Sequence, residues 1–185
     1  MRIQREAGVA GDPVLTPRLI AYAGTLRRRF PRRVGAALVV DVERLAGAVC
    51  ASLEEYPLTD GVLGCTVFVN GRGHTAIQEG LRRRDPARWQ FTLAHETAEI
   101  LLRSYLRALP DQSRRERICD AFAAELLLPR SIVGECVGVL SAACGGARYI
   151  SPVQAEQLAH QFSRLYGVSV TMARISISQS LAEAA

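Results

Sequence analysis

The segment that decides the fold of this chain is Phe91-Thr92-Leu93-Ala94-His95-Glu96-Thr97-Ala98-Glu99. If it is helical, residues four apart lie one above the other, so His95 and Glu99 project from the same face. Glu96 lies beside that face, within reach of anything bound there. Imidazole and carboxylate groups are common metal ligands in proteins. The segment therefore predicts a metal site on a helix.

This segment differs by one residue from the His-Glu-x-x-His motif of zinc peptidases. In that motif the two histidines hold zinc, and the glutamate between them is the general base. Here Glu99 stands at the position of the second histidine. A carboxylate can also ligate zinc, so the substitution changes the predicted donor set without removing it.

A second block of sequence completes the pattern. It runs Glu116-Arg117-Ile118-Cys119-Asp120-Ala121-Phe122-Ala123-Ala124-Glu125-Leu126-Leu127-Leu128-Pro129. With the Phe-Thr-Leu-Ala-His-Glu run, it resembles the ImmA/IrrE metallopeptidases, regulators that clear phage-type or stress-response repressors. The family pattern Glu-x-x-Ala-Asn-x-Phe-Ala-Ala-x-Leu-Leu-Met-Pro is met with Cys119, Asp120 and Leu128 in the places of Ala, Asn and Met. Weaker similarity extends over about residues 13–178.

The resemblance implies a role for each charged residue of the site. His95, Glu99 and Glu116 would be the metal ligands, and Glu96 the general base that takes a proton from the attacking water. The implied cofactor is a divalent metal, with zinc as the first choice and manganese as the alternative. One imidazole and two carboxylates form a harder donor set than two imidazoles and one carboxylate, which moves preference toward manganese or magnesium. The more anionic set also predicts a weaker nucleophile.

Two further residues are candidates for supporting roles. Asp120, one turn after Glu116, can accept the second ring N–H of His95, as metal-bound histidines usually require; an arginine or N–H partner elsewhere is the alternative. His74 is a candidate oxyanion donor or additional ligand, although a lone histidine is more often neither. By resemblance, Thr75, Ala76, Ile77, Gln78 and Glu79 form an edge strand that pairs with an extended substrate; an ordinary edge strand is the alternative.

Composition limits the class of protein. A chain of 185 residues that is 49% hydrophobic and 22% charged is long enough to bury a core and is not disordered. All 23 basic residues are arginine, and the net charge of +5 is interpreted as a solvated surface, with nucleic-acid binding as the less favoured reading.

The 5 cysteines include no Cys-x-x-Cys pair, so free thiols are expected. No long apolar run or signal peptide is evident, which predicts a cytoplasmic protein without a membrane span.

These observations predict an α+β fold in four parts. Residues 1–12 are expected to be a flexible N-terminus, 13–150 a metallopeptidase-like domain, 151–178 a helix-turn-helix-like pair packed on that domain, and 179–185 a flexible tail. Periodicity and caps predict the following helices: 16–30, 41–49, 85–106, one from the turn at 110–113 to Pro129, 131–140, 152–166 and 170–178. Strand character predicts a small antiparallel sheet of about three strands: 50–56, 62–69 and 75–79.

The closing pair of helices has the outline of a DNA-binding helix-turn-helix. Its second helix offers only Arg174 as a strong base reader, so packing on the domain is preferred and direct nucleic-acid binding is not expected.

The resemblance implies a cytoplasmic metalloendopeptidase. Its substrate would be a helix-turn-helix repressor of the Xre type, cut to derepress a mobile-element or stress regulon. The alternative is a weak or inactive pseudo-peptidase that acts as a regulatory protein-binding module, because the Glu99 substitution weakens the expected nucleophile.

Overall fold

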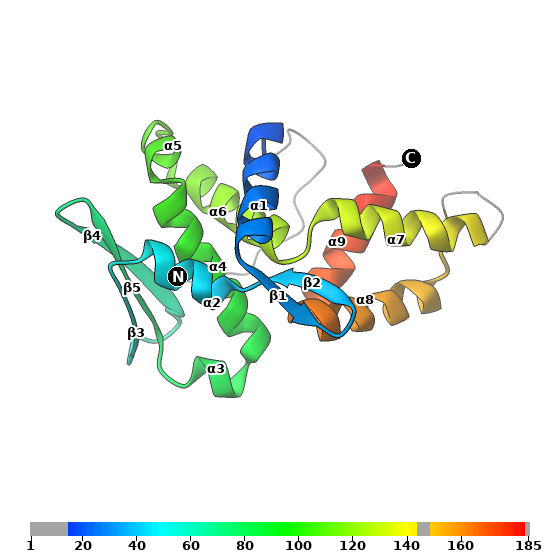
Figure 1. Cartoon of the computed structure of the whole chain (residues 1–185), viewed down its shortest axis with the longest axis horizontal. Helices are drawn as coiled ribbons and strands as arrows, with labels where there is room; N and C mark the ends of the chain where they lie inside the picture. The colour runs from blue at the N-terminus through cyan, green and yellow to red at the C-terminus, as the bar shows by residue number, and fades with distance from the viewer. Residues whose placement is uncertain (1–14, 144–148, 184–185) are drawn as a thin grey trace.

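The structure is a computed structural model that describes residues 15–143 and 149–183. Its architecture is mixed α+β, as the sequence predicts (Figure 1). The helices in these residues are α1 (Pro17–Arg29), α2 (Val42–Val49), α3 (Leu81–Arg84), α4 (Pro86–Leu101), α5 (Arg103–Arg107), α6 (Gln112–Leu127), α7 (Arg130–Ala143), α8 (Pro152–Tyr166) and α9 (Val170–Glu183). The strands are β1 (Pro31–Val34), β2 (Ala37–Val40), β3 (Ser52–Tyr56), β4 (Gly64–Val69) and β5 (Arg72–Gln78). The three-stranded sheet lies at one end of the molecule, α7, α8 and α9 lie at the other, and α4 runs between them (Figure 1).

Helix α4 is the central element of the fold. Asp85 caps its N-terminus by accepting a hydrogen bond from the Arg88 amide at 3.0 Å, and Pro86 occupies the first turn, where no amide hydrogen is needed. Ala94 and Ala98 are completely buried, and side chains this small let neighbouring elements approach closely. The helix ends at Leu101, so the predicted single helix over 85–106 is wrong. Residues 103–107 form the separate short helix α5.

The three-stranded sheet is mixed, which corrects the prediction of an antiparallel sheet. Strands β4 and β5 are antiparallel and are joined by Asn70 and Gly71, both with positive φ, as in a tight hairpin turn. Strand β3 pairs with β5 in parallel, giving the order β3-β5-β4. Strand β5 therefore lies between β3 and β4, although it follows both in the sequence. Local sequence does not encode this long-range choice of partner.

The strand order also corrects the predicted substrate-binding edge. Residues Thr75, Ala76, Ile77 and Gln78 belong to β5, which is the central strand, and Glu79 follows it. Their backbone groups face neighbouring strands on both sides, so this segment cannot add a further strand. The edges of this sheet are β3 and β4.

A second sheet, the β1–β2 hairpin, was absent from the prediction. Its first strand begins Pro31-Arg32-Arg33, which lacks the apolar alternation that predicts a strand. The second strand carries Val39 and Val40, both almost completely buried, so this hairpin is tied to the core.

Helix α9 packs against α7 and α8 packs against β2, and a hydrogen bond also ties the end of α8 to α4. The Gln90 side-chain amide of α4 donates to the Tyr166 carbonyl at the end of α8, at 2.8 Å. Gly167 ends α8 with φ +68°, and a Cβ at that position would lie 2.8 Å from the Gln90 side-chain oxygen. Helix α9 continues to Glu183, beyond the predicted end at 178 and through much of the segment expected to be a flexible tail. The predicted flexible N-terminus, 1–12, lies outside the described residues.

Arg174, the single predicted base reader, is engaged within the protein. Its Nε donates to Glu156 Oε2 at 2.8 Å, and its Nη2 donates to Oε1 of the same carboxylate. Both side chains belong to the α8–α9 pair, so this ion pair joins the two helices.

In the described part of the chain, no single helix has the length and apolarity needed to cross a bilayer; only α6 and α7 taken together, bent by 58° at their junction, meet that test.

Candidate metal centre

Two helices bring the predicted ligands together. Helix α4 supplies His95 and Glu99 one turn apart, and α6 packs beside it to supply Glu116 and Asp120 one turn apart. Asp111 caps α6 by accepting from the Ser113 amide at 2.9 Å. The convergence therefore depends on helix packing between segments that are distant in sequence.

The donor atoms are spaced as a small cation requires. One ligand atom each from His95, Glu99 and Glu116 lies within 4.8 Å of the other two. His95 Nε2 lies 3.4 Å from Glu116 Oε2 and 4.0 Å from Glu99 Oε1. Donors bound about 2.1 Å from a tetrahedral zinc ion lie about 3.4 Å apart, so these residues fit a divalent metal with only a slight contraction.

Hydrogen bonds outside the donor set orient the ligands. His95 Nδ1 lies 2.9 Å from Asp120 Oδ1, so Nδ1 carries the hydrogen that Asp120 accepts and Nε2 is the nitrogen directed at the donor cluster. The Gln112 side-chain amide donates to Glu116 Oε1 at 2.6 Å, on the carboxylate oxygen that does not face His95. Each contact orients a candidate ligand through the atom that faces away from the donor cluster, which is Nδ1 in His95 and Oε1 in Glu116.

The electrostatics of the site favour a positive charge at its centre. Burial alone lowers the pKa of His95, but hydrogen bonds to Asp120 and Glu116 and the charges of Asp120 and Glu96 raise this pKa to about 10. In the absence of an ion, the imidazole is therefore protonated at neutral pH. A metal cation would take over the place of that proton among the carboxylates.

Two carboxylates at the site, Glu99 and Glu96, have raised pKa values and are harder to ionise than usual. Burial and then the charge of Glu96 raise the pKa of Glu99 to about 7, against the lowering effect of His95. Burial also raises the pKa of Glu96, against a hydrogen bond from Thr66 and the charge of His95. A bound cation would oppose these upward shifts by stabilising the ionised forms.

Glu96 lies next to the donor cluster but turns toward the sheet. Its side chain is only 6% exposed, and Thr66 of β4 donates a hydrogen bond to its Oε2 at 2.8 Å. A buried carboxylate held through one oxygen fits the role of general base that the family resemblance implies for Glu96.

His74 does not belong to the site, so its predicted role there is wrong. Alternate residues of a strand face opposite sides of a sheet. Gly73 faces α4, because it lies against Ile100, and Thr75 faces the same side, because it contacts Thr66, which donates to Glu96 of α4. His74 therefore faces away from α4, where its Nδ1 lies 3.0 Å from Ser52 Oγ.

Residues of the sheet that support Glu96 were not predicted from the sequence. Thr66 donates to the carboxylate, Thr75 contacts Thr66, and Gly64 lies so close that a Cβ there would come within 2.8 Å of Glu96 Oε1. No local signal marks these residues, because their role depends on which strand lies against α4.

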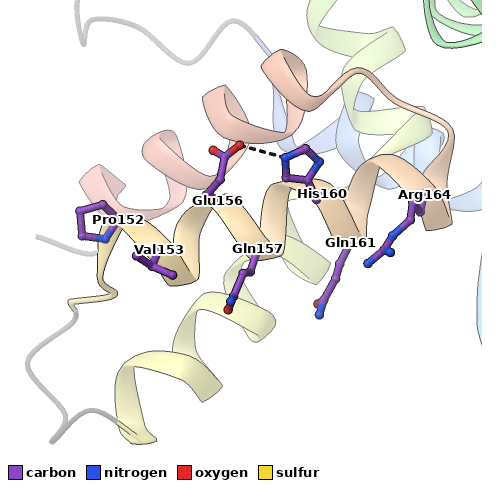
Figure 2. Close-up of a pocket in the computed structure, with 7 residues that line it drawn as sticks. All are labelled: Pro152, Val153, Glu156, Gln157, His160, Gln161 and Arg164. Atoms are coloured by element: carbon purple, nitrogen blue, oxygen red, sulfur yellow. Dashed lines mark ion pairs between the residues drawn. The ribbon is translucent and has the colours of Figure 1, made fainter.

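A separate shallow groove follows the exposed face of α8 and carries no metal-site chemistry. The residues along it are Pro152, Val153, Glu156, Gln157, His160, Gln161 and Arg164 (Figure 2). Within it, Glu156 Oε1 lies 3.0 Å from His160 Nε2 (Figure 2). Glu156 also pairs with Arg174 of α9. All of the residues that line it come from one helix.

The fold and the site together define a metallopeptidase-type arrangement: a helix with His-Glu-x-x-Glu, a second helix with a further acidic ligand, and a small sheet along the first helix. Residues 81–138 match the family model of the IrrE N-terminal-like domain, peptidase M78. This segment contains all of the candidate ligands and Glu96, and the match confirms the resemblance to the ImmA/IrrE metallopeptidase family. Comparison with curated proteins found no match.

Proposed function

We propose that the protein is a metal-dependent endopeptidase of the ImmA/IrrE type. The observation that carries this proposal is the convergence of His95, Glu99 and Glu116 beside the buried carboxylate of Glu96. When bound, a divalent metal would supply Lewis acidity that polarises the scissile carbonyl. Zinc is the first choice, and manganese is the alternative that the carboxylate-rich donor set supports.

The protein's own residues divide the remaining work. Glu96 takes the proton from the attacking water and passes it on to the leaving amine, as expected for a positioned carboxylate in a dry site. Asp120 accepts from His95 Nδ1, keeping the imidazole in the tautomer that presents Nε2 to the ion.

We infer that the extended substrate pairs with strand β4 rather than with residues 75–79. This strand is an edge of its sheet, and Thr66 and Gly64 bring it directly against Glu96. An extended peptide that adds to this edge would run past Glu96 in the orientation that β-augmentation provides. A linker of a protein substrate, rather than a folded element, satisfies this geometry.

The family resemblance points to a repressor as the substrate. We infer a helix-turn-helix repressor of the Xre type, cut in an exposed linker in the cytoplasm, so that a mobile-element or stress regulon is switched on. Within the described residues, Arg174 is paired with Glu156, so DNA recognition through Arg174 would have to compete with this ion pair.

The test compares wild-type protein with Glu96→Gln on an Xre-type repressor encoded beside its gene, with zinc or manganese added. Loss of the base is expected to lower the cleavage rate about 100-fold or more, while the metal content stays the same. Glu43→Gln, on the exposed face of α2, is the matched control and should cleave like the wild type. Equal cleavage by Glu96→Gln and wild type would rule out Glu96 as the base.

A second candidate function is regulatory binding without hydrolysis. The observation that favours it is Glu99, which replaces the histidine of the motif and has a pKa of about 7. A ligand that is partly protonated at neutral pH binds a metal weakly. This alternative predicts repressor binding that neither a chelator nor Glu96→Gln changes.

A further inference from the structure

A series of partly buried hydrogen bonds leads from the sheet to Glu96. Thr66 Oγ1 of β4 lies 2.8 Å from Glu96 Oε2, and Thr75 Oγ1 of β5 lies 3.1 Å from Thr66 Oγ1. Cys50 Sγ, just after α2, lies 3.6 Å from Thr75 Oγ1. Thr75 is 3% exposed, so water does not offer its hydroxyl an alternative partner.

The direction of this series follows from counting hydrogens. Each hydroxyl has a single hydrogen to donate, and an ionised carboxylate can only accept. Thr66 donates to Glu96, so Thr75 must donate to Thr66, and the Cys50 thiol must donate to Thr75. Every donor therefore points toward the carboxylate, and bonds aligned in this way polarise and strengthen one another.

Gly64 allows β4 to lie close enough to α4 for the hydrogen bond from Thr66 to Glu96 to form. A Cβ at this position would lie 2.7 Å from Thr92 Cγ2 and 2.8 Å from Glu96 Oε1. These separations are shorter than van der Waals contact, so only glycine lets β4 lie this close to α4. Thr66 follows two residues later on the same face of β4, where the short approach brings its hydroxyl to the carboxylate.

We propose that Thr66, backed by Thr75 and Cys50, is a positioning residue that fixes the carboxylate of Glu96 in its working orientation. The bond to Oε2 stops rotation of the carboxylate and leaves Oε1 to accept the proton. This inference rests on the proposed peptidase function for its catalytic consequence. The contact itself is independent of that function.

Kinetics test the catalytic consequence, with a quenched-fluorescence peptide that the wild-type protein cleaves. Thr66→Val keeps the shape and removes the hydroxyl; it is expected to lower kcat about 10- to 100-fold with KM within about twofold, because a misplaced base loses catalysis rather than binding. Thr66→Ser should recover most of the rate, and Thr75→Val should lose less than Thr66→Val. An unchanged kcat in Thr66→Val, or an equal loss in Thr66→Ser, would overturn the role.

Thr97→Val is the matched control for these variants. Thr97 is a fully buried threonine next to Glu96, but its hydroxyl donates to the Leu93 carbonyl of its own helix at 2.7 Å. The same substitution there should leave kcat unchanged. A loss equal to that of Thr66→Val would show general sensitivity of the buried region and would overturn the assignment.

Unfolding in urea tests the contact without any substrate or metal. Thr66→Val should lower the urea midpoint more in the wild-type background than in the Glu96→Met background. Only the wild-type background contains the Glu96 carboxylate, which loses its hydrogen-bond donor when Thr66 is replaced. Equal shifts in both backgrounds would overturn the inference. A wild-type protein that cleaves no peptide, but shows this coupling, would count against the proposed function while leaving the Thr66–Glu96 contact supported.

Discussion

At the scale of single residues, the site is defined by the way in which each ligand is held. His95 is fixed through Nδ1 by Asp120, and Glu116 is fixed through Oε1 by Gln112, so the remaining donor atoms of both residues are held toward the same cluster. Preorganised ligands of this kind lose little entropy on binding an ion. The affinity of the site should therefore depend on these partners as well as on the ligands.

Removal of the charge at Asp120 tests this dependence. Asp120→Asn is expected to weaken metal affinity about 10- to 100-fold, because partners that orient a metal-bound histidine typically contribute that much. Competition with a chromogenic zinc chelator measures the affinity. Asp60→Asn, in the exposed loop after β3, is the control and should bind as the wild type does. Equal affinities for all three proteins would show that Asp120 does not support His95.

The pKa values of the ligands predict how metal affinity varies with pH. The raised pKa values of His95, about 10, and Glu99, about 7, mean that both hold protons that a cation must displace. Each proton released adds about tenfold to the affinity per pH unit, so affinity should rise about 100-fold per unit below pH 7 and about tenfold per unit between about pH 7 and about pH 10.

Chelator competition at several pH values measures these slopes. Glu99→Gln is the internal comparison, since it should lose the extra slope below pH 7 and keep the slope due to His95. A pH-independent affinity in the wild-type protein would contradict the assigned ligand pair.

At the scale of secondary-structure elements, caps and periodicity predicted most helices, whereas strand partners could not be predicted. Thr16 and Asp41 cap α1 and α2 as expected, because a cap acts on amides only a few residues away. The order β3-β5-β4 depends on contacts across the sheet, so it left no local signal and the edge strand was assigned wrongly. The same limit concealed the Thr66–Glu96 contact, whereas the two sequence blocks predicted His95, Glu99 and Glu116 as a group, and the fold brings these three together.

The close packing of β5 on α4 gives a prediction at this scale. A Cβ at Gly73 would lie 2.6 Å from both Cγ1 and Cδ1 of Ile100, so Gly73→Ala should lower the free energy of unfolding by about 1–3 kcal/mol through overpacking. Gly47→Ala is the matched control: nothing lies within 4 Å of its Cβ position in α2. This change should raise stability by about 0.5–1 kcal/mol through helix propensity.

Urea denaturation compares the two alanine variants directly. Adding Ile100→Val to Gly73→Ala should restore part of the lost stability, because it removes the Cδ1 atom from the clash. If Gly73→Ala is as stable as the wild type, β5 does not approach α4 as closely as described.

At the scale of the whole molecule, an anionic centre lies within a chain of net charge +5. Glu99, Glu116 and Asp120 lie around His95 where α4 packs on α6, Glu96 is adjacent, and burial raises the pKa values of Glu96 and Glu99. A partly buried cluster of carboxylates is costly unless a cation neutralises it. The surrounding fold therefore indicates metal binding more strongly than any one side chain does.

Metal content measured by elemental analysis of the purified protein tests this central claim most directly. We predict about one divalent ion per chain after loading with zinc or manganese and gel filtration, and its loss in Glu116→Ala, because three protein ligands are the usual minimum for such a site. Glu99→His should retain the ion and shift preference toward zinc. A wild-type protein that holds no ion, or a Glu116→Ala protein that holds as much as the wild type, would contradict the account.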